Sequence, residues 1–159
     1  MRRSSQQLRF YICLAVPNVL GLITAIANFK AIRNLLSSIN KPPLTLPTFI
    51  LVLSWIVAYL AIGYATFLIW DTRAFSDDKL KAIGLCAGQL LLHSFWVTCF
   101  FQYHWYFFSL LLHIIFLALT FGNMMLYRQL HKDTSIPMIS YFVFCVYFTY
   151  LNLVVIFIN

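Results

Sequence analysis

Four long segments without a charged residue dominate this chain. They run over residues 10–29, 42–70, 82–127 and 134–159. Each is long enough to cross a bilayer, because a membrane-spanning helix needs about 20 predominantly apolar residues. The third segment has 46 residues, and at about 1.5 Å per helical residue it far exceeds a hydrocarbon core of about 30 Å. The chain must therefore turn back within this segment.

The expected turn is at Gln102-Tyr103-His104, the polar cluster near the middle of the third segment. Five helices result, at roughly residues 8–29, 47–70, 82–101, 105–127 and 136–158. The predicted fold class is all-α, an integral membrane five-helix transmembrane bundle, in a single domain over residues 1–159. The longest connection, residues 30–46, is expected to be either a lid over a pocket or a plain connector.

Composition supports a membrane location. Hydrophobic residues make up 62% of the chain, aromatic residues 18% and charged residues only 9%. That leaves too little polar surface to cover a soluble domain of this length. The expected partner is the lipid bilayer, and the expected location is multi-pass, in a bacterial inner membrane or a mitochondrial outer membrane.

The net charge of +7 is distributed unevenly between the connections. The N-terminal segment and the second and fourth connections together carry eight Lys and Arg residues, against three in the first connection. The positive-inside tendency then predicts a cytoplasmic N-terminus. No basic helix and no repeated basic-aromatic pattern occurs in the sequence, so we expect no nucleic-acid partner.

The N-terminal segment has two possible interpretations, a cleavable signal or a retained membrane span. Arg2-Arg3 and Ala25-Ile26-Ala27 flank an apolar run and resemble a cleavable secretory signal, but the run is longer than the usual core of about 7–15 residues. We favour a retained span.

The cysteines and acidic residues give no sign of a metal site or a catalytic site. The cysteines lack metal-ligand spacing and the acidic residues lie in loops or at helix ends, so we expect no metal and no catalytic residue. The residues concerned are Cys13, Cys86, Cys99, Cys145, Asp71, Asp77, Asp78 and Asp133.

Polar and aromatic residues recur at helical spacing in four of the predicted spans. Unsatisfied polar groups are expensive in lipid and usually face the interior of a bundle. These stripes predict either a pocket for a flat, apolar ligand with a few polar groups, or a packed core tied by interhelical hydrogen bonds. Their members are Trp55 and Tyr59; Gln89, His93, Trp96 and Phe100; His113, Phe116, Thr120, Asn123 and Tyr127; and Tyr141, Phe144, Phe148 and Asn152.

The order of these residues along nearly the whole chain resembles one family. The matching blocks are Lys41-Pro42, Pro47, Trp55, Tyr59 and Gly63; then Gln89-Leu90, Trp96 and Phe100-Phe101; then Tyr141, Leu151-Asn152 and Asn159. They resemble the translocator protein family, also called tryptophan-rich sensory proteins or peripheral benzodiazepine receptors. No single motif carries the likeness, but together the blocks are specific.

The resemblance implies a membrane receptor or sensor that binds tetrapyrroles, such as protoporphyrin IX and haem, and benzodiazepine-site ligands inside the bundle. Alternatives are a passive carrier of porphyrins or lipids, or a weak light-dependent porphyrin-degrading enzyme. No obligatory cofactor is expected. The predicted ligand-binding residues are Ala25, Leu51, Trp55, Tyr59, His93, Trp96, Phe108, Phe144, Phe148 and Leu151.

The chain also departs from the family pattern. A family Trp-Tyr pair is Leu35-Leu36 here, and Phe144 replaces a tryptophan linked to porphyrin photodegradation. Because phenylalanine is much harder to oxidise than indole, we expect binding without efficient photodegradation. His93 replaces an asparagine, so it either ligates haem iron or joins two helices. A basic residue after Tyr150 is missing, which disfavours sterol handling.

Gly84 and Gly88 form a GxxxG motif near the start of the third predicted span. Small residues at this spacing let another helix approach closely. Two interpretations remain. We predict a homodimer interface through the third helix, as the resemblance implies; the alternative is that the motif lets a neighbouring helix of the same bundle pack tightly.

Overall fold

The computed structural model describes residues 2–38, 43–73 and 76–158. In this part of the chain, five helices are long and apolar enough to cross a membrane. Two short helical segments join them. The elements are α1 (Arg2–Ala27), α2 (Phe29–Ser38), α3 (Thr48–Asp71), α4 (Ser76–Phe101), α5 (Tyr106–Leu130), the 3-10 turn η1 (Lys132–Thr134) and α6 (Ser135–Ile158). The predicted five-helix transmembrane bundle is therefore confirmed.

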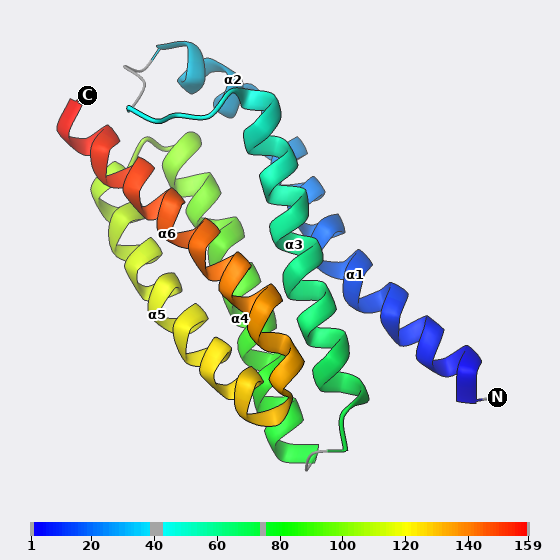
Figure 1. The fold of residues 1–159 in the computed structure, drawn as a ribbon. Helices are drawn as coiled ribbons and strands as arrows, with labels where there is room; N and C mark the ends of the chain where they lie inside the picture. Colours follow the sequence, from blue (N-terminus) through cyan, green and yellow to red (C-terminus); the bar gives the residue numbers. More distant parts are fainter. Residues whose placement is uncertain (1, 39–42, 74–75, 159) are drawn as a thin grey trace.

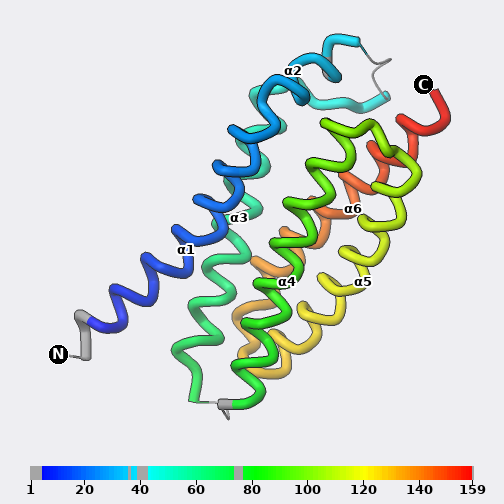
Figure 2. Tube along the Cα trace, turned by 180° about the vertical axis from the view of Figure 1, so that it is seen from behind, coloured from blue at the N-terminus to red at the C-terminus, as the bar shows by residue number. Residues whose placement is uncertain are grey.

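Helices α3, α4, α5 and α6 form a four-helix bundle, and α1 packs outside it, mainly against α3 (Figures 1 and 2). The short helix α2 lies across one end of the bundle, near the end of α6 and the α4–α5 connection. We call this the α2 end. The α3–α4 and α5–α6 connections lie at the other end, which carries Arg73, Lys81, Arg128 and Lys132. We call this the basic end.

The predicted turn at Gln102-Tyr103-His104 separates α4 from α5. His104 adopts a positive φ of 55°, a conformation that reverses the chain sharply. Helix α5 then begins at Tyr106, and the amide of Ser109 donates to the carbonyl of Trp105 at 2.8 Å. At the start of α3, Pro47 fits the position before a first helical turn, where an amide hydrogen is not needed.

The prediction that residues 30–46 form a loop is wrong for the first part of that range. Residues 29–38 form helix α2, because Ala31, Ile32 and Leu35 share one helical face and pack against the aromatic interior. Two other helices begin earlier than expected, at Arg2 rather than about 8 and at Ser76 rather than about 82. Lys41-Pro42 and Asn159, which carry part of the resemblance, lie outside the described residues.

Two glycines allow α1 to approach α3 closely. A Cβ atom added to Gly63 would lie 2.5 Å from the main-chain oxygen of Cys13 and 3.1 Å from the Cα of Leu14. One added to Gly21 would lie 2.1 Å from the Tyr59 ring. The contacts of 2.5 Å and 2.1 Å are shorter than any real side-chain carbon shows. At Gly63 the neighbour is main chain, so the close α1–α3 approach depends on glycine there, whereas at Gly21 the Tyr59 ring would have to shift.

Candidate functional site

An aromatic cluster fills the interior of the bundle at the α2 end. Trp55 of α3 stacks on Phe148 of α6, with ring centroids 5.6 Å apart and an interplanar angle of 22°. Trp96 of α4 is 1% exposed and stacks on Phe100 at 5.5 Å. Its ring also meets Phe148 edge-on at 6.0 Å. The cluster therefore joins three helices through ring-to-ring contacts, which favour offset and edge-to-face arrangements.

Helical spacing explains why these rings meet. Trp96 and Phe100 are one turn apart on α4, and Phe144 and Phe148 are one turn apart on α6. Phe144 and Phe148 lie 4.7 Å apart. Residues separated by four positions share a helix face, so each helix presents its own aromatic stripe to the same interior. Leu35 of α2 is 2% exposed and packs against the cluster at the α2 end of the bundle.

Hydrogen bonds cross the interior below the rings. The hydroxyl of Tyr59 and Nδ1 of His93 share a hydrogen bond of 2.9 Å between α3 and α4. His113 of α5 places Nε2 3.2 Å from the carbonyl oxygen of Cys145 on α6. His93 also stacks on Trp96 at 5.4 Å. Both histidines therefore join helices, as one of the two sequence interpretations of His93 expects.

Asn152 connects three helices at the α2 end. In the amide orientation that satisfies its neighbours, the side-chain oxygen accepts from Nε1 of Trp96 at 2.9 Å. The same oxygen lies 3.3 Å from the amide nitrogen of Leu110, and the side-chain nitrogen donates to the carbonyl of Tyr106 at 3.2 Å. This one side chain of α6 therefore fixes the indole of Trp96 relative to the start of α5.

Several buried polar atoms beside the cluster have no hydrogen-bond partner among the described residues. They include both amide atoms of Gln89, Nδ1 of His113, Nε1 of Trp55 and the hydroxyl of Ser109. Gln89, Ser109 and His113 are fully buried. An unpaired polar group costs several kcal/mol in a membrane interior, on the order of 2–7 kcal/mol in the absence of any partner. The interior thus offers free donors and acceptors next to its aromatic walls.

The structure brings most of the predicted binding residues together. Four of them pack against the buried cluster that contains Trp96 and Phe148: Leu51, Trp55, Phe144 and Leu151. Tyr59 and His93 share a hydrogen bond, and the His93 ring stacks on Trp96. Ala25 is half-buried on α1, and Phe108 is 43% exposed with its ring against Trp105. Phe108 thus lies on the outer face of α5.

Some residues of this site were absent from the predicted binding set. Leu35 belongs to the segment expected to be a loop, so no helical face indicated its burial. Asn152 and Gln89 appeared in the stripes and in the blocks that match the family, and helical spacing marked them as interior residues without revealing their partners.

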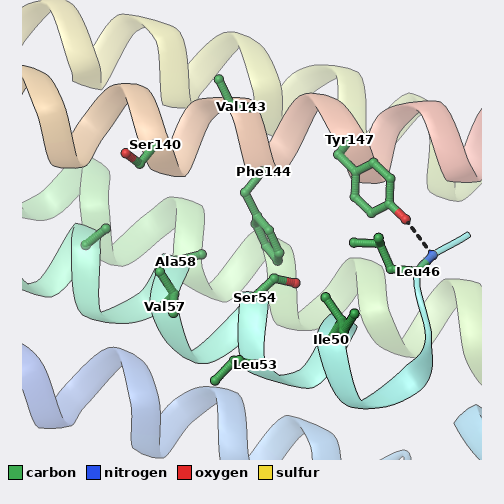
Figure 3. A pocket seen from close by; sticks show the side chains of 11 residues that line it. Leu46, Ile50, Leu53, Ser54, Val57, Ala58, Ser140, Val143, Phe144 and Tyr147 are labelled. Atoms are coloured by element: carbon green, nitrogen blue, oxygen red, sulfur yellow. Dashed lines mark hydrogen bonds between the residues drawn. The ribbon is translucent and has the colours of Figure 1, made fainter. Parts of the chain in front are cut away.

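A groove of about 540 Å³ runs along the outside of the aromatic cluster, between α3 and α6 (Figure 3). Its walls are almost entirely apolar, and the Phe144 ring points from α6 toward α3 across it. Phe144 and Tyr147 both line the groove and contact Phe148, so these two rings lie between the groove and the cluster. The lining residues are Leu46, Ile50, Leu53, Ser54, Val57, Ala58, Ala61, Ser140, Val143, Phe144 and Tyr147.

Two tyrosines of α6 hold the segment before α3 over one end of the groove. The Tyr147 hydroxyl donates to the carbonyl of Leu44 at 3.1 Å and accepts from the amide of Leu46 at 3.2 Å. The Tyr150 hydroxyl donates to the carbonyl of Pro43 at 2.9 Å. Together with α2, this segment covers the α2 end of the bundle.

A bundle of membrane-spanning helices with an aromatic interior, buried polar groups and a covered end defines a multi-pass membrane protein. The model of the TspO/MBR family matches residues 13–158 of the chain. The chain belongs to this family, which confirms the resemblance found in the sequence.

Relatives with curated names support the same assignment. The chain is 41% identical over 80 residues to the translocator protein of Ovis aries, covering 48% of this chain and 47% of the relative. It is 39% identical over 66 residues to that of Bos taurus, covering 41% and 39%. It is 26% identical over 104 residues to translocator protein 2 of Canis lupus familiaris, covering 64% and 60%. The chain spans about half the length of the Ovis aries and Bos taurus relatives.

Proposed function

We propose that this protein is a membrane receptor or sensor that binds tetrapyrroles, such as protoporphyrin IX or haem, and benzodiazepine-site ligands within the bundle. The observation that supports this proposal is the set of unpaired, buried polar atoms beside stacked aromatic rings. A ligand with flat apolar rings and a few polar substituents suits both features, because rings stack on aromatic walls and polar groups satisfy the free donors and acceptors.

Trp55 is the residue that tests the proposal most directly. Its indole stacks on Phe148 and carries an unpaired Nε1. We expect Trp55→Ala to weaken protoporphyrin IX binding at least tenfold, because the loss of stacking and apolar contact amounts to about 2 kcal/mol. A fluorescence titration of the protein in nanodiscs with protoporphyrin IX, haemin and cholesterol measures this change.

Trp105→Ala is the matched control for this titration. Trp105 is 54% exposed and lies against Tyr103 in the α4–α5 connection, away from the cluster. The control is expected to bind like the unmodified protein. Equal affinity of the Trp55 variant and the control would refute the internal site.

The lateral groove favours a second function, passive carriage of porphyrins or lipids. It lies between two membrane-spanning helices, and the rings of Phe144 and Tyr147 lie between it and the cluster. A ligand dissolved in the bilayer would then enter sideways without crossing the covered end. A carrier accelerates protoporphyrin transfer between vesicles, whereas a receptor binds it without doing so.

Light-dependent degradation is expected to be slow in this protein. Phe144 stands beside Phe148, and phenylalanine does not donate an electron as readily as indole. We expect Phe144→Trp to raise the rate of protoporphyrin loss under illumination at least tenfold, as measured by product absorbance. Phe107→Trp, at a site that is 67% exposed, provides the control. Fast turnover in the unmodified protein that depends on Trp55 would contradict the prediction.

A homodimer through α4 is a further proposal. Gly84 and Gly88 lie on the exposed face of α4, and a Cβ atom at either position meets no described atom within 4 Å. The alternative interpretation of the motif, tight packing against a helix of the same bundle, therefore has no support at these glycines.

We expect Gly84→Leu with Gly88→Leu to shift the mass of the protein in detergent from that of a dimer to that of a monomer. Gly122→Leu, equally open but on α5, is the control, and an unchanged mass for the double variant would exclude this interface.

The orientation and the membrane also belong to the proposal. The basic end carries the excess of Lys and Arg that the positive-inside tendency assigns to the cytoplasm. The N-terminus of α1 extends toward the same side (Figure 1). The proposed topology thus has a cytoplasmic N-terminus, in a bacterial inner membrane or a mitochondrial outer membrane.

A further inference from the structure

A second depression lies at the basic end, where α5 turns into α6. It has a volume of about 510 Å³ and is lined by Met125, Arg128, Gln129, Lys132 and Ser135. α5 ends at Leu130 and α6 begins at Ser135. The depression therefore lies at the end of two spans, at the depth where a bilayer changes from hydrocarbon to headgroups.

The polar lining of the depression is cationic and carries hydrogen-bond donors. Neither Arg128 nor Lys132 forms an ion pair with an acid in the described parts of the chain. The neighbouring Asp133 is 81% exposed in its side chain and lies 3.9 Å from His131. At the end of α3, Asp71 accepts from Gln6 at 2.7 Å and lies 4.0 Å from Arg9. Asp71 thus has partners outside the depression, and the Asp133 carboxylate is largely exposed.

An apolar strip continues from the depression along the membrane-facing side of α5 and α6. Phe121 lies one turn before Met125 on α5, and Ile139 lies one turn after Ser135 on α6. Phe121 is 48% exposed, Ile139 is 50% exposed, and the Phe121 ring meets Phe142 of α6 at 5.8 Å. Acyl chains pack on such a surface in a bilayer, while the cations lie immediately beyond it.

We propose that this depression and strip form a binding site for an anionic phospholipid, separate from the internal site. Arg128 and Lys132 bind the phosphate, with the guanidinium able to contact two phosphate oxygens at once. The Gln129 amide and the Ser135 hydroxyl donate to the headgroup. The acyl chains lie along Phe121, Ile139 and Phe142. The apolar strip favours a lipid over free phosphate, since phosphate alone leaves the strip without an occupant.

The experiment uses the full chain purified from bilayers that contain phosphatidylcholine and phosphatidylglycerol, with retained lipid counted by native mass spectrometry. Arg128→Gln with Lys132→Gln is expected to lower the retained phosphatidylglycerol at least tenfold, since each cation near a membrane surface contributes about a fivefold preference. Arg128→Lys is expected to retain less phosphatidylglycerol than the unmodified protein and more than the double variant, because an ammonium cannot contact two phosphate oxygens at once. Phosphatidylcholine retention is expected to stay unchanged in all variants.

The matched control is Arg73→Gln with Lys81→Gln, which removes the same two residue types from the same end, Arg73 from the α3–α4 connection and Lys81 from the second turn of α4. Retention in this control is expected to equal that of the unmodified protein. An equal loss in the control would show diffuse attraction to the surface and overturn the site. Full retention in the Arg128 and Lys132 variant would overturn it as well. Displacement of the lipid by millimolar glycerol phosphate would assign the pocket to free phosphate instead.

Discussion

Replacing Gly63 with alanine is expected to lower the free energy of unfolding by about 3 kcal/mol, at the upper end of the usual cost of overpacking. The added Cβ would lie 2.5 Å from the oxygen of Cys13 and 3.1 Å from the Cα of Leu14. Both atoms belong to the main chain of α1, so no side-chain rotation relieves the clash. The whole helix must move away from α3. Unfolding of the protein in mixed micelles with increasing SDS, followed by circular dichroism, measures the loss.

Gly122→Ala on α5 is the control for this change. No described atom lies within 4 Å of the Cβ that it adds, and alanine is a better helix former than glycine by about 1 kcal/mol. The control is therefore expected to be neutral or slightly stabilising. If Gly63→Ala unfolds at the same SDS fraction as Gly122→Ala, the close α1–α3 approach is not required for stability.

Replacing Asn152 with leucine is expected to lower the free energy of unfolding by about 2 kcal/mol and to weaken protoporphyrin binding. Leucine has a similar size but leaves the indole N–H of Trp96 without its acceptor at 2.9 Å. A buried donor that loses its partner costs about 1–3 kcal/mol. Binding suffers because Trp96 then no longer holds its position in the cluster. The SDS titration and the porphyrin titration give the two values.

A double-mutant cycle separates this hydrogen bond from the other effects of the substitution. In a Trp96→Phe background the indole donor is absent, so Asn152→Leu is expected to cost at least 1 kcal/mol less than in the unmodified protein. An equal cost in both backgrounds would show that Asn152 acts through its contacts with Tyr106 and Leu110 and not through Trp96.

Part of the site was predictable because helical spacing reveals which residues share a face. Trp55 and Tyr59 on α3, and Phe144 and Phe148 on α6, were assigned to the interior from their spacing of four residues. The structure packs these residues in or beside the aromatic cluster. The hydrogen bond between Tyr59 and His93 follows from two such stripes facing each other.

Phe108 and Leu35 show where this reasoning ends. The resemblance placed Phe108 in the pocket. The buried positions on α5 include the next residue, Ser109, and then His113 and Phe116, and one residue along a helix turns the side chain by about 100°. Leu35 was assigned to a loop, because a helix of ten residues is too short to stand out from its surroundings. Its helical face is stable only because the aromatic cluster covers it.

The sequence by itself determined the number of spans, the family and the aromatic and polar stripe of each helix, because length, hydropathy and periodicity are local properties of the chain. The tertiary structure decided which stripes meet, that α2 closes one end, and that a groove and a cationic depression lie on the outer surface. Those features depend on the rotation and depth of each helix relative to its neighbours. Contacts between distant residues set them, such as Gly63 with Cys13 and Asn152 with Trp96.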